Sequence, residues 1–323
     1  KSRLGVNFDW YRKTTKDLII LRDAQLDQGK EPPYFNGGDI RNTGIELSVT
    51  WNDRIGSDFS YNLGVNFATN KNEVINESVA ENATYPGRAG YPVGALFAYK
   101  TAGLDENGYP LFVAKDGSIQ TMKDFFALDG AGASKLTAAE QRDLYTYMGT
   151  EDPKCSGGLM NHFEYKNWSL GINFIFNLGM KVRVQPSYNP VYFDRGLNTN
   201  HDILNRWSED NTGSNLLPLL VQTTETGKEY QRFSDGIGNT YNMLDTWIKS
   251  CNYWRLQSLR IAYRLPSEWL RQFGISSASL SLEGRNLMVF ASNYDNYLDP
   301  ETMGNPYAQP IAKSIIFGLN VNF

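Results

Sequence analysis

The sequence has few of the residues on which metal and disulfide chemistry depend. Its 323 residues include 2 cysteines, Cys155 and Cys251, and 2 histidines, His162 and His201. Two cysteines are too few for a disulfide scaffold, and these four residues lack the spacing of a zinc site. There is no Ser-His-Asp order near a strand-to-helix turn and no glycine-rich phosphate loop. These absences argue against a metalloprotein and against an enzyme.

The sequence also lacks an excess of positive charge and any long hydrophobic run. It has 31 basic and 35 acidic residues and a formal net charge of -4, which argues against the basic surface of a nucleic-acid-binding protein. The mean hydropathy is -0.45, and no stretch approaches the roughly 18 to 20 consecutive apolar residues that a membrane helix needs. The chain starts at Lys1 without the features of a signal peptide. We therefore expect part of a longer protein, with no nucleic-acid partner.

What the sequence does contain is a repeated alternation of apolar and polar residues. Aromatic residues make up 13% of the chain and glycine occurs 29 times, a composition that favours strands and turns. In residues 4–10 every second side chain is apolar, which is the period of a β-strand with one apolar face. The same alternation returns in residues 45–51, 59–67, 168–176, 259–264, 278–285 and 315–323. The sequence predicts an all-β antiparallel fold.

The lengths of the connections favour a membrane barrel over a soluble sandwich, in which alternation also occurs. Short predicted connections, at residues 11–16, 52–58, 166–167 and 266–274, alternate with long ones, at residues 24–38, 71–156, 183–250 and 291–311. Several strands are near the roughly 9 to 11 residues that cross a bilayer. Aromatic residues such as Trp51, Trp168 and Trp269 lie beside the short turns. This is the pattern of a transmembrane β-barrel with short periplasmic turns and long extracellular loops.

The predicted crossings also indicate that the barrel is incomplete. If the chain ends in the periplasm, counting backwards makes residues 4–10 a descending strand and gives an odd number of crossings. Bacterial single-chain barrels have an even number. Whether residues 93–113 add a hairpin to the wall is left open.

Several segments resemble the signature of the SusC/RagA family of TonB-dependent outer-membrane transporters. The segment WRLQSLRIAYRLP begins at Trp254 and is followed by GRNL from Gly284. The motifs NYD from Asn293, DPE from Asp299 and the ending IIFGLNVNF from Ile315 keep the order of that family. The segment NTGIE from Asn42 resembles a strand found more widely among TonB-dependent receptors.

The resemblance covers essentially residues 1–323 and implies roughly the carboxyl-terminal half of a 22-stranded barrel. It implies active import of a large nutrient, a glycan or oligosaccharide or a peptide, across the bacterial outer membrane. The implied partners are a SusD-like surface lipoprotein, outer-membrane lipid, and TonB with ExbB and ExbD. TonB would act through a plug domain that, like the TonB-contacting segment, is missing from this chain.

The long segment at residues 183–250 holds the candidate substrate-binding residues. Aromatic faces among amide and carboxylate groups suit the stacking and hydrogen bonding of a sugar or peptide. The alternative is that the rings pack the loop against itself or against the partner lipoprotein. The candidates are Tyr188, Tyr192, Trp207, Tyr241 and Trp247.

Charged residues on the polar register of the strands are the candidate lumen-lining residues. They would hold the plug or line the route of the solute, or they are simply solvated in a polar lumen. They are Asp9, Glu46, Glu164, Arg260, Arg264, Glu283 and Arg285.

No cofactor is expected. Calcium binding by Asp295, Asp299 and Glu301 is weighed against an ordinary turn around Pro300, which is favoured. A disulfide between Cys155 and Cys251 stays open, although the one strand that separates their strands opposes the geometry that a disulfide needs.

Two other functions stay in view beside the importer. One is a secreted all-β module that binds a glycan, and the other is a passive porin. The sequence does not identify the nutrient, the oligomeric state or the reason for the missing amino-terminal half.

Overall fold

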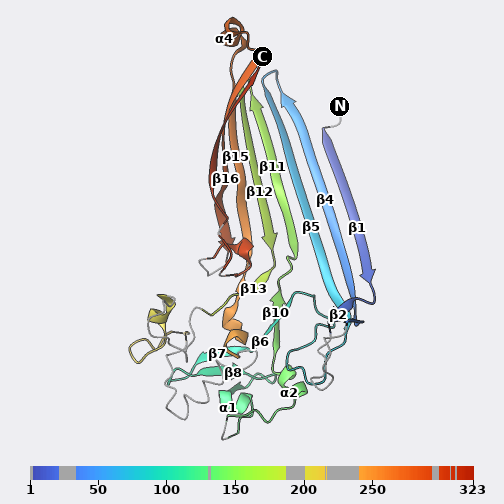
Figure 1. Cartoon of the computed structure of the whole chain (residues 1–323), viewed down its shortest axis with the longest axis vertical. Coiled ribbons are helices and arrows are strands. Elements are labelled where there is room, and N and C mark those ends of the chain that lie inside the picture. The colour runs from blue at the N-terminus through green and yellow to red at the C-terminus, as the bar shows by residue number, and fades with distance from the viewer. Residues whose placement is uncertain are drawn as a thin grey trace.

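The body of the molecule is a twisted antiparallel sheet of eight long strands, seen in the computed structural model of Figure 1. The structure describes residues 3–21, 34–129, 132–186, 201–214, 216, 240–292, 298–305, 307–309 and 311–323. The strands pair in the order in which they follow along the chain. They are β1 (Leu4–Thr15), β4 (Gly38–Ile55), β5 (Phe59–Glu77), β11 (Cys155–Tyr165), β12 (Trp168–Leu178), β15 (Asn252–Arg264), β16 (Ser277–Ser292) and β17 (Ser314–Asn322).

Short connections lie at one end of this sheet and long ones at the other, as predicted. Gly56, with a φ of 65°, lies in the turn between β4 and β5, and Lys166, with a φ of 53°, begins the two-residue turn between β11 and β12. Both positions need the left-handed backbone region that such tight turns use. The third short connection contains α4 (Ser267–Leu270) and η5 (Arg271–Phe273). In Figure 1 β1 begins and β17 ends at this same short-turn end.

The predicted short turn at residues 11–16 and the odd number of crossings are wrong. Strand β1 continues to Thr15, which pairs with Ile40 of β4. The following segments, β2 (Ile19–Leu21) and β3 (Tyr34–Asn36), form a separate two-stranded sheet. The alternation ends at Tyr11 because the strand leaves the apolar zone and its last residues pair with polar residues of β4. Strand β1 therefore runs towards the long-loop end, and the number of crossings among the described strands is even.

The long connections fold together at the other end of the sheet, and we call this assembly the loop unit. It contains small sheets outside the main one, so residues 93–113 do not add strands to the wall. Its strands are β6 (Ala95–Ala98), β7 (Thr101–Leu104), β8 (Pro110–Val113), β9 (Ile119–Gln120), β10 (Thr146–Thr150), β13 (Lys181–Arg183) and β14 (Ile248–Ser250). Its helical segments are α1 (Met122–Phe125), α2 (Ala138–Asp143), η2 (His201–Asn205), η3 (Thr240–Met243), η4 (Asp245–Trp247) and η6 (Pro300–Thr302).

The largest buried cluster lies mainly in the loop unit and only at its edge in the long sheet. It includes Phe112, Val182 and Cys251, each at most 1% exposed. The long strands mostly lack such burial on either face. The sheet is therefore a single layer, unlike the two packed layers of a sandwich.

One face of the sheet is apolar and exposed. Phe8, Phe317 and Leu319 are 63%, 82% and 69% exposed. Register pairs such as Phe8 with Leu47, and Leu282 with Phe317, keep the apolar residues of neighbouring strands on this face. So large an apolar surface on a well-ordered sheet is explained by contact with hydrocarbon. The rival sandwich, in which these side chains would form a core, does not match this structure.

The sheet is the wall of an open barrel segment. Among the described strands, β1 and β17 each pair on one side only. The eight strands are fewer than the half-barrel that the resemblance implied. No helix in the described ranges is long and apolar enough to span a membrane.

An arginine on the apolar face should block assembly where the same arginine on the polar face does not. Leu47 lies midway along β4 on the apolar face, and its neighbour Ser48 lies on the polar face. We expect Leu47→Arg in the full-length protein to cost about 2 to 4 kcal/mol of folding free energy in a bilayer, and Ser48→Arg much less. The folded fraction in phospholipid vesicles, measured by heat-modifiable gel mobility, checks this. Equal losses for the two variants would contradict the assignment of the faces.

Candidate functional site

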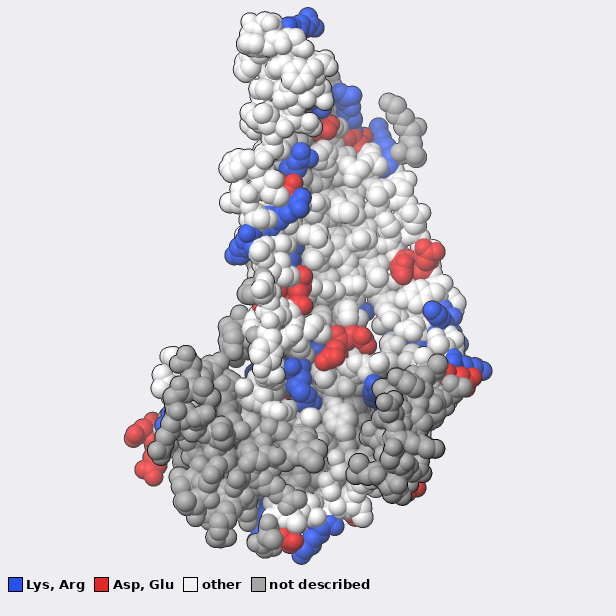
Figure 2. All heavy atoms as spheres, viewed as in Figure 1, with Lys and Arg blue, Asp and Glu red and all other residues white. Residues whose placement is uncertain are grey.

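All seven predicted lumen-lining charges lie on the polar face of the sheet. Asp9 pairs directly with Glu46, and Arg260 pairs with Glu283. Directly opposed residues of neighbouring antiparallel strands share a face, and the same register carries Glu164, Arg264 and Arg285 onto this side. Figure 2 shows charged side chains gathered along part of the sheet and around its loop end, with broad uncharged areas between them.

Several of these charges have partners on the polar face. Arg285 Nε lies 2.6 Å from Glu283 Oε1, while Glu164 accepts a hydrogen bond from Ser60 Oγ at 3.2 Å and lies 3.3 Å from His162 Nε2. Asp9 and Glu46 border a hollow of about 410 Å³ whose lining mixes polar and apolar residues. Six of the seven side chains are exposed, with Glu283 half-buried. The face can therefore contact a polar solute or a polar protein segment, and lumen lining stays a prediction.

Two of the predicted substrate-binding residues meet in the loop unit. Tyr241 of η3 and Trp247 of η4 are 3% and 5% exposed, and their rings are 5.3 Å apart in an edge-to-face arrangement. Both belong to the buried cluster, so they pack the loop unit as the alternative interpretation held. They also border a cavity of about 530 Å³, which is in the usual range for a ligand pocket.

The lining of this cavity is mixed in polarity. Asp245 accepts a hydrogen bond from Thr101 Oγ1 at 2.6 Å, and Lys249 lies on the same wall. Trp207 lies close to this lining, because its backbone N–H donates a hydrogen bond to the carbonyl of Leu216, which is also a lining residue. A carboxylate, an ammonium group and aromatic edges suit the backbone and side chains of a peptide or the hydroxyls of a sugar. Tyr188 and Tyr192 lie outside the described residues, and a binding role for the five aromatic residues stays a prediction.

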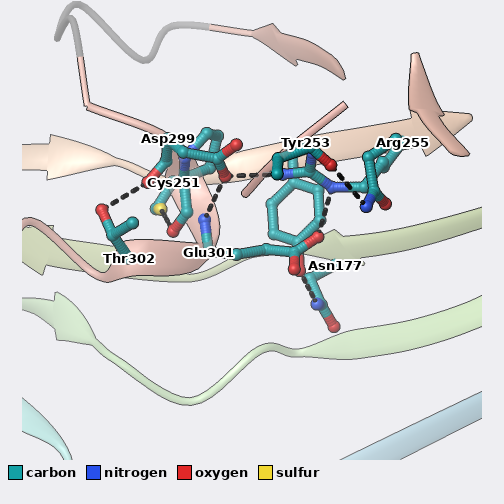
Figure 3. A network of polar contacts seen from close by, with 10 residues as sticks. Asn177, Cys251, Tyr253, Arg255, Asp299, Glu301 and Thr302 are labelled. Carbon is teal, nitrogen blue, oxygen red and sulfur yellow. Dashed lines mark hydrogen bonds and ion pairs between the residues drawn. The ribbon is translucent and has the colours of Figure 1, made fainter. Parts of the chain in front are cut away.

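A tightly built polar site in the described residues centres on Arg255, to which the sequence analysis assigned no role. Arg255 of β15 is 3% exposed, and its guanidinium lies between two carboxylates of the connection from β16 to β17, as Figure 3 shows. Its Nε donates to Glu301 Oε1 at 2.5 Å and its Nη2 donates to Asp299 Oδ1 at 2.5 Å. A guanidinium shared between two carboxylates is a strong charge-assisted arrangement. We call this group the Arg255 clamp.

Further hydrogen bonds hold η6 in the clamp. Asp299 caps the start of η6 by accepting from the backbone N–H of Glu301 at 3.0 Å, and Pro300 occupies the first helical position. The thiol of Cys251 donates to the carbonyl of Pro300 at 3.2 Å. At the far end Gly304 has a φ of 72°, and a side chain there would meet the backbone of Arg183. The clamp therefore joins β15, the last long connection and the two-stranded sheet of β13 and β14.

This arrangement bears on the calcium and disulfide alternatives. Asp299 and Glu301 are engaged with Arg255, which opposes the binding of a calcium ion by the same oxygens, and Asp295 lies outside the described residues. No group of three or more potential metal ligands occurs in the described part of the chain. Cys155 and Cys251 are both free thiols. Burial, with a smaller effect from Asp299, raises the pKa of Cys251 to about 11.

Comparisons with known proteins agree with this structure. Residues 1–105 match the family model described as TonB dependent receptor-like, beta-barrel. The chain is 25% identical, over its whole length, to TonB-dependent receptor P3 of Formosa agariphila and covers 32% of that protein. It is 23% identical to TonB-dependent receptor SusC of Bacteroides thetaiotaomicron, with 99% of this chain and 30% of SusC covered.

A solved structure shows the same fold. The structure of the RagAB peptide transporter superposes with a TM-score of 0.73 at 25% identity, covering 99% of this chain and 34% of that one. Fold and sequence together are similar to a segment of a TonB-dependent receptor barrel, and these comparisons support the resemblance to the SusC/RagA family. It spans about a third of the length of the relatives that it matches.

Removal of the Arg255 guanidinium should destabilise the protein far more than removal of an exposed one. In Arg255→Ala, Asp299 and Glu301 would remain partly buried without their cation, at a cost of about 3 to 5 kcal/mol. The control is Arg285→Ala on the same face, whose exposed pair with Glu283 is worth about 0 to 1 kcal/mol. Unfolding of the full-length protein in detergent by urea measures both. Similar midpoints for the two variants would show that the clamp is not a stabilising contact.

The Cys251 thiol should be unreactive while the clamp is intact. It is 0% exposed, and its raised pKa of about 11 keeps it neutral at pH 8, whereas Cys155 is only half-buried. We expect iodoacetamide at pH 8 to modify Cys155 first, because the thiolate is the nucleophile and access is required. Peptide mass mapping checks the order. Rapid alkylation of Cys251 in the folded protein would contradict the described packing.

Proposed function

We propose that the chain forms part of the wall and outer loops of a transporter that imports a large polar nutrient across the bacterial outer membrane. The observation that carries this proposal is the single-layer sheet with an exposed apolar face and a charged opposite face. A wall of this kind separates hydrocarbon from an aqueous passage. The loop unit, with its cavity, stands at one end of that passage and is placed to contact a solute first.

The cavity and the relatives support a proposal for the solute class. A space of about 530 Å³ bordered by Tyr241, Trp247, Asp245 and Lys249 suits part of a peptide or of an oligosaccharide. One similar structure is titled a peptide transporter and one relative is named SusC. We propose a peptide or glycan as the solute, and a SusD-like lipoprotein as the partner that covers the loop unit.

The mechanism we propose is movement, without bond chemistry. The solute binds among the outer loops, and a plug segment elsewhere in the full-length protein then rearranges under force from TonB, ExbB and ExbD. Energy supplied from outside biases a conformational equilibrium that the solute alone would shift only by its differential affinity. The polar face of the sheet then contacts the solute as it passes. With the long loops outside the cell, the carboxyl terminus would lie in the periplasm.

Uptake through the full-length transporter should depend on TonB. We expect cells that express it to deplete a mixture of labelled oligopeptides or oligosaccharides, and to stop when the tonB gene is deleted or the proton gradient is collapsed. Mass spectrometry of the medium measures the depletion, and a strain without the transporter is the control. Persistence of uptake without TonB would favour a passive porin and overturn the proposal.

A further inference from the structure

The third short connection differs from the other two in length and structure. The turns that follow β4 and β11 contain residues 56–58 and 166–167, whereas the connection from β15 to β16 contains α4 and η5. We call residues 266–274 the elbow. The elbow begins at Pro266, two residues after the end of β15, and ends at Gly274, whose φ of 69° stops the helical turn. Figure 1 shows α4 at the extreme short-turn end of the sheet.

The elbow packs against the apolar face of the sheet. Leu270 is 7% exposed and Ala278 of β16 is 4% exposed, and α4 contacts β16. Ala278 lies on the same face as Leu280 and Leu282, which are 49% and 45% exposed. Burial of Ala278 alone among these three indicates that the elbow covers it. The elbow therefore lies on the outside of the wall and not over the polar face.

The elbow also presents a small amphipathic surface of its own. Trp269 and Phe273 are 60% and 69% exposed although both are large and aromatic. Trp269 lies in α4 and Phe273 ends η5, so each short helical segment contributes one exposed ring. The exposed Arg271 lies between them in sequence and makes no ion pair with any residue of the described ranges.

The depth of the elbow can be placed from the strand register. Tyr263 pairs with Leu280, and its ring contacts the ring of Trp168 at 4.7 Å, as part of the aromatic belt at the short-turn end. Ala278 is two residues beyond Leu280, which is about 7 Å along a strand. The headgroup layer of one leaflet is about 5 to 8 Å thick. An elbow seated on Ala278 therefore lies at headgroup level, just beyond the aromatic belt.

From these observations we propose that the elbow is an interfacial anchor that binds phospholipid at the short-turn side of the membrane. Trp269 and Phe273 insert at the boundary between headgroups and acyl chains, where aromatic rings are favoured. Arg271 contacts lipid phosphate, which a guanidinium recognises through paired hydrogen bonds. The apolar face continues into the elbow without interruption, which favours lipid over a protein partner. The inference rests on the membrane-spanning sheet and is independent of the solute.

Spin labels at single cysteines test the anchor in the intact transporter. Phe273→Cys is labelled in a background that carries Cys155→Ser and Cys251→Ser, in vesicles of phosphatidylethanolamine and phosphatidylglycerol. Val65→Cys on the apolar face and Ala139→Cys on α2 of the loop unit are the controls for hydrocarbon and for water. Collision with oxygen and with a water-soluble nickel chelate reports the depth of each label.

We expect the depth of the label at residue 273 to lie between the depths of the two controls, and its collisions with oxygen to be more frequent than those with the nickel chelate. Trp269→Gln with Arg271→Gln should shift it towards the water control while Val65 stays unchanged. A label at residue 273 as exposed to water as that at residue 139 would overturn the anchor and favour a periplasmic protein as the occupant. A label at residue 65 in water would instead overturn the membrane-spanning sheet itself, which separates failure of the anchor from failure of the fold.

Discussion

The structure depends on one constraint. A single-layer sheet must form its backbone hydrogen bonds between neighbouring strands, while one face contacts hydrocarbon and the other contacts water. In hydrocarbon an unpaired N–H or C=O costs several kcal/mol. Strands β4 and β5 therefore stay paired along 18 and 19 residues with one register shift. The side chains then sort by position alone, apolar to one face and polar to the other. Edge strands β1 and β17 carry unpaired backbone groups, which the rest of the full-length barrel would pair.

A sheet with no core of its own needs other contacts to hold its loops. The loop unit supplies the buried aromatic cluster, and the Arg255 clamp attaches the last long connection to β15. Because Arg255 is buried and its two carboxylates are partly buried, each charge depends on its partners for stabilisation. At the opposite end α4 contacts β16, and Leu270 and Ala278 are buried there. The molecule thus has polar contacts on its charged face and apolar contacts on the other.

The wall was predictable from the sequence because its signal is local. Alternation in residues 4–10 or 168–176 needs only a period of two, and the turn at Lys166 needs only two residues. The seven charges predicted to line the lumen were placed on one face by the same counting. The end of β1 was missed because Arg12 and Lys13 lie beyond the apolar zone, where alternation carries no signal.

The clamp was not predictable by this counting. A register shift between Leu256 and Ser258 moves Arg255 onto the face of Arg260, although simple alternation would set it beside Leu259 and Ile261. Bulges of this kind leave no reliable mark in a single sequence. The pairing of Arg255 with Asp299 also joins residues far apart in the chain. Such contacts depend on the fold of a long loop, which alternation does not encode.

The most direct test of the central claim is the exposure of consecutive positions along β12 to lipid. Single cysteines at residues 169–174 of the full-length transporter would carry a bimane fluorophore in vesicles that contain brominated phospholipid. The account predicts strong quenching at Leu170, Ile172 and Phe174 and weak quenching at Ser169, Gly171 and Asn173. Quenching without this alternation would contradict a sheet that separates lipid from water.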